Sequence, residues 1–342
     1  MAERRVGLKD VAAAAGVSVG TVSHVLNHPE RVSEGRRAAV ERAIADLGFV
    51  RDESARQLRA GYSTTIGLLL LDAWNPAFAE MGRGVEDAAA KAGMTLLMSN
   101  SARDLGREDT YLRVFSEHRV AGAVVVPHDP MSQGLHQVRA GGVPVVVLDR
   151  TDRREGVVSV GVDDRLGGRL AAEHLLTLGH RRIAFAGDTT VAAPVADRRD
   201  GFLEATAGLA SVEELPCGLT IDGGREVALR LLDRPPAERP TAVQCAVDVA
   251  AVGLVHELHR HGVRVPEDLS VVGYDDIPLA AELTVALTTI ARPHHAMGVA
   301  AFDLLSTMIG GLEPAEPHPV FAPSLVVRGS SAPVATGQGA RS

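Results

Sequence analysis

The sequence predicts a small all-α helix-turn-helix head followed by an α/β core of two lobes, each with a doubly wound parallel sheet. Two short helical patterns separated by a tight break occupy residues 8–27, and from residue 66 onward short apolar runs alternate with helical stretches. The apolar runs form two successive sets, which predicts two lobes facing a cleft. A length of 342 residues and a hydrophobic content of 46% are ample for such a core.

The head is predicted to contain three short helices. Apolar residues recur at i, i+3, i+4 and i+7 from Leu8, which lines one face of a first helix. Gly16 can adopt the left-handed conformation that ends this helix, and Ser18 can cap the second helix. A third helix is expected from Ser33 to Leu47.

The face of the second helix that turns away from the first carries mostly small or polar side chains. These are Val19, Gly20, Thr21, Ser23, His24 and Asn27. Such groups suit contact with base edges in a DNA groove, and three short helices are typical of a DNA-binding head. The alternative is ordinary surface packing of an Ala-rich helix.

The core is predicted from β-branched runs that alternate with helical spacing. The expected strands begin at Ile66, Thr95, Gly122 and Val143 in the first set, and at Val158, Arg182, Cys217, Ala242 and Leu269 in the second. Helical spacing occupies residues 76–92, 166–178 and 249–261 between them. Continuous apolar strands joined by helices indicate parallel sheets covered on both faces.

Charge is distributed unevenly along the chain. The net charge is −8, but residues 1–62 hold 10 Lys+Arg against 8 Asp+Glu (+2), and the remainder holds 25 against 35 (−10). A basic head on an acidic core has the sign expected of a DNA-binding module. Cys217 and Cys245 lack metal-site spacing and are expected to be buried free thiols. Neither a secretory signal nor a membrane-length apolar run is evident, which predicts a cytoplasmic protein with no membrane partner.

Motifs of catalysis do not support an enzyme. The GxSxG at Gly16–Gly20 follows a helix rather than a strand, so it is the break between two helices and not a nucleophile elbow. Neither a P-loop nor a GxGxxG opening the first α/β unit is present. His256, Glu257, His259 and His261 resemble a metal cluster but miss the HExxH spacing, and their place at a helix end favours a surface position. We therefore expect neither an enzyme nor a cofactor.

The head resembles the LacI (lactose repressor) family of bacterial transcription regulators. The similarity runs through LKDVAAAAGVSVGTVSHVLN, then VS at Val32, then LGFVRDESARQLRAG from Leu47 to Gly61. The resemblance implies that Val19, Gly20 and His24 enter the major groove of double-stranded operator DNA. Further contacts to phosphates or base edges are implied for Ser18, Thr21, Ser23, Asn27 and Arg31.

The same resemblance implies a hinge helix over residues 54–60. In the family this helix folds on the operator and inserts a leucine into the minor groove, which here is Leu58, flanked by Ala55 and Arg59. A leucine in a polar, basic segment has no evident hydrophobic core to pack into, which favours its insertion between base steps of the DNA. Arg51 and Asp52 depart from the usual Pro and Asn, and an aspartate there would face phosphate unfavourably.

The core resembles the same family, whose effector-binding part has the periplasmic-binding-protein-like (type I) fold of sugar-binding proteins. Landmarks include NPAFAEMGRGVEDAA, VPVVVLDR, RRDGF, LSVVGYDDIPLA and LTTIARP. The fold implies three crossings between lobes, near Val162, Ala291 and Pro323. By motif position, effector-binding candidates are Asp72, Asn75, Phe78, Asp149, Arg150, Arg165, Arg198, Val247 and Asp275.

Two alternatives qualify these candidates. The aspartates can cap neighbouring helices or loops, and Arg165 and Arg198 can be solvated surface charges on helices. Val247 stands where the family usually has a sugar-binding Asn before Asp248. Loss of that amide predicts an effector that is less hydroxylated than a typical sugar, or not a sugar.

The sequence thus predicts a transcriptional repressor that binds a pseudo-palindromic operator as a homodimer under control of a small-molecule effector, such as a sugar or related metabolite. The expected parts are a head (1–50), a hinge and linker (51–62), an effector-binding and dimerisation core (63–330) and a flexible tail (331–342). A solute-binding protein and an α/β enzyme are the alternatives that use the same two-lobed core.

Overall fold

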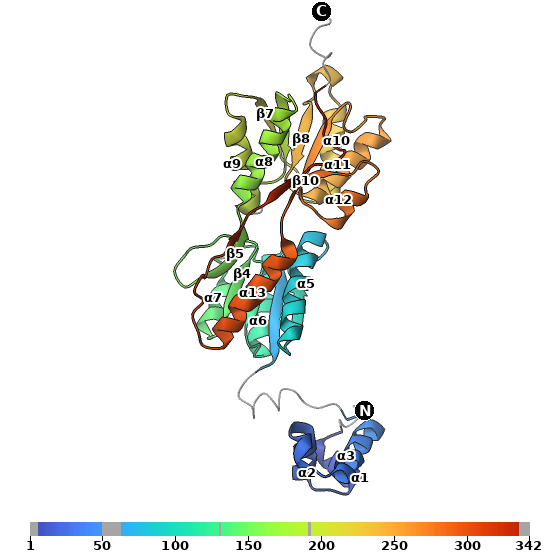
Figure 1. The fold of residues 1–342 in the computed structure, drawn as a ribbon, viewed down its shortest axis with the longest axis vertical. Coiled ribbons are helices and arrows are strands. Elements are labelled where there is room, and N and C mark those ends of the chain that lie inside the picture. Colours follow the sequence, from blue (N-terminus) through green and yellow to red (C-terminus); the bar gives the residue numbers. More distant parts are fainter. Residues whose placement is uncertain (1–5, 50–62, 130, 191–192, 335–342) are drawn as a thin grey trace, which may run out of the picture. The chain divides into compact units, whose positions relative to one another are not determined.

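The computed structural model describes residues 6–49, 63–129, 131–190 and 193–334 (Figure 1). The chain divides into two compact units, Met1–Tyr62 and Ser63–Ser342. In the described ranges, no helix combines the length and the apolar character needed to cross a bilayer.

The head is built from three α-helices. They are α1 (Leu8–Ala15), α2 (Val19–Asn27) and α3 (Glu34–Leu47), with a 3-10 turn η1 (Pro29–Arg31) between the last two. Gly16 has φ 63° and ends α1, and the backbone N–H of Thr21 donates to Ser18 Oγ at 3.1 Å to cap α2. Val11, Val22 and Val40 meet fully buried in the centre. The helix-turn-helix prediction is confirmed.

The first lobe is a six-stranded parallel sheet with helices on both faces. Its strands are β1 (Thr65–Leu70), β2 (Thr95–Asn100), β3 (Ala123–Val125), β4 (Val145–Leu148), β5 (Val158–Val162) and β11 (Val320–Phe321), in the order β11-β5-β4-β3-β1-β2. Alternate residues of β1 and β4 face α5 (Pro76–Lys91) and α13 (His294–Ile309), and the others face α6 (Leu105–Glu117) and α7 (Gln133–Ala140). Burial on both faces explains the continuous apolar runs.

The second lobe repeats this architecture. Its strands are β6 (Arg182–Ala186), β7 (Ser211–Leu215), β8 (Ala242–Cys245), β9 (Ser270–Asp275), β10 (Thr288–Ala291) and β12 (Ser324–Val326), in the order β12-β10-β9-β8-β6-β7. All pairings are parallel except β10 with β12. The helices are α8 (Asp164–Thr177), α9 (Ala193–Thr206), α10 (Ile221–Leu232), α11 (Asp248–Arg260), α12 (Pro278–Glu282) and the 3-10 turn η2 (Pro236–Glu238).

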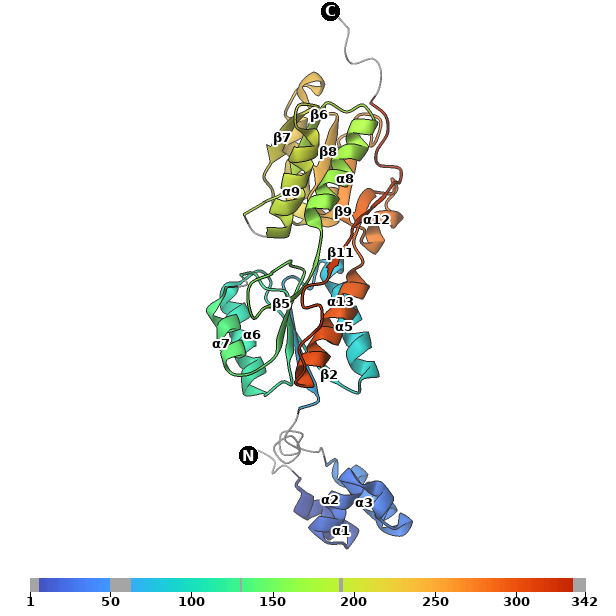
Figure 2. The same cartoon turned by 60° about the vertical axis from the view of Figure 1, so that its left-hand side comes forward.

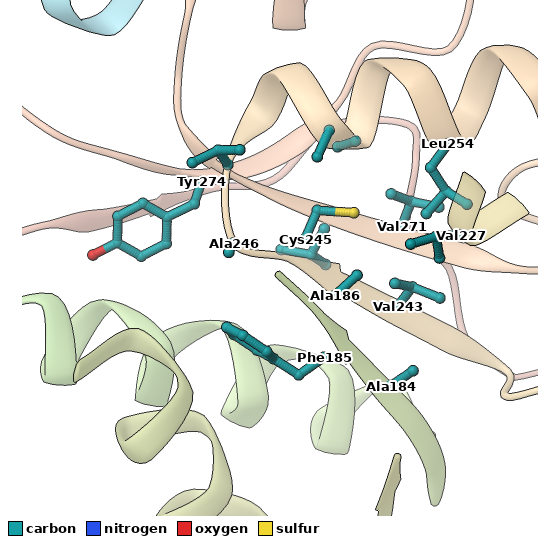
Figure 3. Close-up of a cluster of buried hydrophobic side chains, with 14 of the residues drawn as sticks. Ala184, Phe185, Ala186, Val227, Val243, Cys245, Ala246, Leu254, Val271 and Tyr274 are labelled. Carbon is teal, nitrogen blue, oxygen red and sulfur yellow. The ribbon is translucent and has the colours of Figure 1, made fainter. Parts of the chain in front are cut away.

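The cysteines are buried and free, as expected. Figure 3 shows Cys245 on β8 among Val227, Val243 and Val271 in the core of the second lobe. Burial raises the pKa of the Cys217 thiol to about 11 and raises the pKa of the Cys245 thiol well above its ordinary value, so both remain protonated at neutral pH.

Three sequence predictions about the second lobe are wrong. The strand expected at Val158 as the first of the second set is β5, which pairs with β4 in the sheet of the first lobe. The strand expected at Cys217 is a loop that leads to Thr220, the cap of α10, and the strand of this region is β7. The edge strand β7 carries the charged Glu213 and Glu214, so its apolar pattern is weak. The tail does not begin at residue 331 either, because Ala332 and Val334 hydrogen-bond to Ser270, His180 and Leu178. The core therefore extends to residue 334.

The chain crosses between the lobes three times (Figures 1 and 2). In the first crossing, β5 of the first sheet leads into α8 of the second lobe. In the second, β10 of the second sheet leads back into α13 of the first lobe. In the third, β11 of the first sheet leads into β12 of the second. These crossings lie at Val162, Ala291 and Pro323, as the sequence predicts. Each lobe is thus completed by segments distant in sequence.

Two glycines allow α8 and α9 to pack with their backbones in contact. A Cβ atom at Gly168 would lie 1.9 Å from the carbonyl oxygen of Arg198, and one at Gly201 would lie 1.9 Å from that of Arg165. Because backbone atoms cannot yield as a flexible side chain does, both positions require glycine. This contact brings Arg198 of α9 beside Asp164 of α8.

We expect Gly168→Ala to lower the free energy of unfolding of the core by about 1–3 kcal/mol, because the helices must separate to accept a methyl group. Urea unfolding measures the change. Gly218→Ala is the matched control, since its new Cβ would lie 3.5 Å from Thr220 Oγ1 at ordinary contact distance. Equal destabilisation by the two substitutions would contradict this account of the helix pair.

Candidate functional site

The head presents one side of α2 to solvent while the other forms the core. Val22 and Val25 are buried, whereas Val19 is 41% exposed at the start of the helix and His24 is exposed one turn later. The other predicted DNA contacts in the described range are exposed or half-buried on α2 and η1 or directly before α2: Ser18, Gly20, Thr21, Ser23, Asn27 and Arg31. Solvent can therefore reach all of these residues. The hinge residues Ala55, Leu58 and Arg59 lie outside the described residues.

The core contains a cleft between its two lobes. Seven of the nine effector-binding candidates line it: Asn75, Phe78, Asp149, Arg150, Arg198, Val247 and Asp275. The cleft holds about 610 Å³ of atom-free space, with the open solvent at its mouth included. Asp149 follows β4 and Asp275 ends β9, so the carboxyl ends of parallel strands from both lobes supply its polar groups.

Two candidates do not line the cleft. Asp72 lies behind it, where its carboxylate is 3.6 Å from Nε of Arg103, a cleft residue that the sequence reasoning missed. Arg165 is on the outer surface of the second lobe and pairs with Glu204 and Asp200 of α9. Arg165 is thus the solvated helix charge that the sequence allowed as an alternative.

The most important residue missed by sequence reasoning is Arg292. It follows β10 at a crossing between lobes, and its side chain is 2% exposed. Its guanidinium donates to Asp149 Oδ1 of the first lobe and, at 3.3 Å, to Asp275 Oδ1 of the second. One arginine therefore joins the predicted binding carboxylates of both lobes. A charged residue directly after a buried strand in LTTIARP was the available signal.

Arg198 belongs to the second lobe alone. It donates to Asp164 Oδ1 at 2.9 Å and to the carbonyl oxygen of Ala246 at 2.7 Å, and it lies 3.8 Å above the Tyr274 ring. The Tyr274 hydroxyl donates to the same Asp164 oxygen at 2.8 Å. Burial would lower the pKa of Arg198, but the nearby carboxylates, Asp164 first, outweigh it and raise the pKa above its ordinary value. Arg198 is therefore a fixed buried cation.

The backbone is strained at the two carboxylates that Arg292 joins. Asp149 has φ 65° and Asp275 has φ 120°, both in the region that favours glycine. Such conformations cost about 1–3 kcal/mol each and persist where the surrounding structure holds them, commonly at ligand sites. Their coincidence in the cleft marks it as a functional site.

Asp248 is buried beneath the cleft at the start of α11, directly after the cleft residue Val247. Its oxygens accept hydrogen bonds from Thr289 Oγ1 at 2.6 Å and from the backbone N–H of Ile277 at 2.9 Å. Burial, together with the negative charge of Asp275, raises the pKa of Asp248 to about 7. Within the described ranges, no group of three His, Cys, Asp or Glu side chains could hold a metal ion.

We expect Asp248 to make the stability of the core pH-dependent. An aspartate in the unfolded chain titrates near pH 3.9, so between about pH 4 and 7 the folded state binds more protons and the free energy of unfolding falls as pH rises. The free energy of unfolding of the unsubstituted chain should fall with rising pH more steeply than that of Asp248→Asn. The difference between the two slopes should be at most about 1.4 kcal/mol per pH unit across this window.

Urea unfolding from pH 4 to pH 8 measures this difference. Asp303→Asn, at an exposed position of α13, is the control for removing one carboxylate. Parallel stability curves for the unsubstituted chain and Asp248→Asn would show that this carboxyl does not titrate in the window.

Comparisons with known proteins agree with both parts. The model described as bacterial regulatory proteins, lacI family, matches residues 7–52, and the periplasmic binding protein-like domain matches residues 172–331. The HTH-type transcriptional repressor PurR of Aliivibrio fischeri (strain MJ11) is 34% identical over 87% of this chain and 90% of that protein. The ribose operon repressor of Escherichia coli (strain K12) is 34% identical over 95% of this chain and 99% of that protein.

A solved structure has the same architecture. The lac repressor dimer bound to operator and the anti-inducer ONPF superimposes with a TM-score of 0.81 at 28% identity, covering 96% of this chain and 100% of that one. With curated relatives at this identity over nearly their full length, the chain belongs to the lacI family of bacterial regulatory proteins and is a DNA-binding transcriptional repressor.

Proposed function

We propose that the chain represses transcription as a homodimer whose two heads read the halves of a pseudo-palindromic operator. A two-fold protein dimer matches a palindrome, and one small head buries too little surface for tight specific binding. Val19 and His24 would contact base edges from α2, while Ser18, Thr21, Ser23, Asn27 and Arg31 would contact phosphates or neighbouring bases. The hinge would kink the operator through Leu58, with Ala55 and Arg59 beside it in the minor groove.

The effector would bind in the cleft of the core. The observation that carries this proposal is that Arg292 donates hydrogen bonds to Asp149 of the first lobe and to Asp275 of the second. A molecule that changes these hydrogen bonds acts on both lobes at once. Effector binding would change the relation between the lobes, and through it the affinity for the operator, by typically 1–3 kcal/mol. The lac repressor structure supports the arrangement, since it is a dimer bound to operator and to a small anti-inducer.

The proposal is tested by selecting operator fragments from random DNA and repeating the binding with a broad metabolite mixture. We expect selective binding that weakens steeply with salt, and an operator affinity that the mixture changes. Equal binding to selected and random fragments would overturn the DNA part. An unchanged affinity with every metabolite fraction would overturn the effector part.

We expect His24→Ala to weaken binding to the selected operator by about 5- to 150-fold, the equivalent of about 1–3 kcal/mol for one base contact. Binding to random DNA should stay the same, because phosphate contacts carry it. Fluorescence anisotropy with both DNAs measures the ratio. His118→Ala, an exposed histidine that ends α6, is the control. A parallel loss on both DNAs would assign His24 to phosphate contact.

A further inference from the structure

The hydrogen bonds of Arg292 to Asp149 and Asp275 determine the charge and the free hydrogen-bond acceptors that a ligand meets in the cleft. Asp149 and Asp275 each use one carboxylate oxygen to accept from this guanidinium. The second oxygen of each makes no hydrogen bond with any described residue and can accept from a hydroxyl group. The two carboxylates therefore retain acceptor capacity while their negative charge is offset by a built-in cation.

The cleft contains more arginine than acid. Four arginines line it, Arg103, Arg150, Arg198 and Arg292, against two aspartates, Asp149 and Asp275. Two further carboxylates behind the lining, Asp72 and Asp164, pair with Arg103 at 3.6 Å and with Arg198 at 2.9 Å. Three of the four guanidinium groups thus have carboxylate partners.

Arg150 is the remaining arginine. It directly follows Asp149, is half-buried, and its guanidinium forms no hydrogen bond or ion pair with the residues that the structure describes. Its charge acts on Asp152 and Asp197 without an ion pair to either: Asp152 is hydrogen-bonded to Arg154, and Asp197 lies on α9. A half-buried cation without a direct partner is a binding group for an anion.

Further polar atoms of cleft residues lack partners. Within the described ranges, the donor Nε of Arg292 and the ring nitrogen Nδ1 of His128 are buried without a hydrogen-bond partner, and both residues line the cleft. A buried guanidinium N–H without an acceptor costs free energy that an incoming anionic oxygen would recover. Val247, Phe78 and Leu148 supply an apolar wall beside these groups.

We infer that the effector is a small hydroxylated anion whose carboxylate or phosphate binds Arg150 and whose hydroxyl groups donate to Asp149 and Asp275. This inference rests on the proposed effector role of the cleft and adds the charge of the ligand to it. Arg150 is then a specificity-determining residue that separates an acidic ligand from its neutral parent.

Six probes in two matched series test the inference: glucose, gluconate and glucose 6-phosphate, and ribose, ribonate and ribose 5-phosphate. Trp74, the single tryptophan of the chain, is 88% exposed and lies between the cleft residues Leu71 and Asn75, so its fluorescence reports binding without a label. Calorimetry confirms each affinity at constant ionic strength. We expect an anionic member of one series to bind at least tenfold more tightly than its neutral sugar.

Arg150→Gln should weaken that binding by roughly 10- to 100-fold, the range for a lost charge-assisted hydrogen bond. Arg150→Lys should restore part of it because the positive charge returns. Arg153→Gln is the matched control, since this exposed arginine follows β4 in the same loop but does not line the cleft. Unchanged melting temperatures without ligand show that the variants fold.

The series also separates the two kinds of anion, because a carboxylate site prefers the sugar acid and a phosphate site prefers the ester. Equal or tighter binding of the neutral sugar, no binding by any of the six probes, or full anion affinity in Arg150→Gln overturns the inference. Operator binding with the metabolite mixture is measured in parallel. If the metabolite mixture changes operator affinity while one of these results is found, the proposed effector role of the cleft stands. Only the inference that the effector is an anion is then overturned.

Discussion

Arg198 and Arg292 pair with three carboxylates, the buried Asp164 and Asp275 and the half-buried Asp149, and this pairing constrains the core. Charges taken out of water cost several kcal/mol each unless they are paired and hydrogen-bonded. Arg198 is balanced within the second lobe by Asp164, whereas Arg292 needs Asp149 from the first lobe and Asp275 from the second. The charge balance of the two lobes is therefore shared, and a ligand that alters it in one lobe affects the other.

Backbone geometry places these charges. The contact of α8 and α9 at Gly168 and Gly201 fixes the distance between Asp164 and Arg198. A Cβ atom at Gly167 would lie 2.1 Å from the Tyr274 hydroxyl, so glycine here also keeps the tyrosine over Arg198. The positive φ angles of Asp149 and Asp275 turn the ends of β4 and β9 toward Arg292. The site thus depends on residues that do not touch its ligand.

The head and most of the core could be predicted from the sequence, because helical spacing, caps and continuous apolar runs are local signals. The edge strand β7 was missed, since charged residues on a half-exposed strand weaken the apolar pattern, and Cys217 and Leu219 mimic one in the loop that follows. Seven cleft residues were found by their positions in the motifs of the family that the chain resembles, and two of them, Asp149 and Asp275, stand at the carboxyl ends of buried strands, where polar groups of a parallel sheet converge. Arg292 was missed because arginine is rarely buried, and its partners lie 143 and 17 residues away.

The three crossings have a consequence for how the protein is made. The first lobe needs α13 for its core and β11 for its sheet, and both are translated after nearly all of the second lobe. Domains whose segments are contiguous can fold one after another as the ribosome delivers them. Here the earlier lobe has to wait with its helix-binding face uncovered until residues 294–321 emerge. A nascent chain stalled before that point would expose apolar surface and become a substrate for chaperones or proteases.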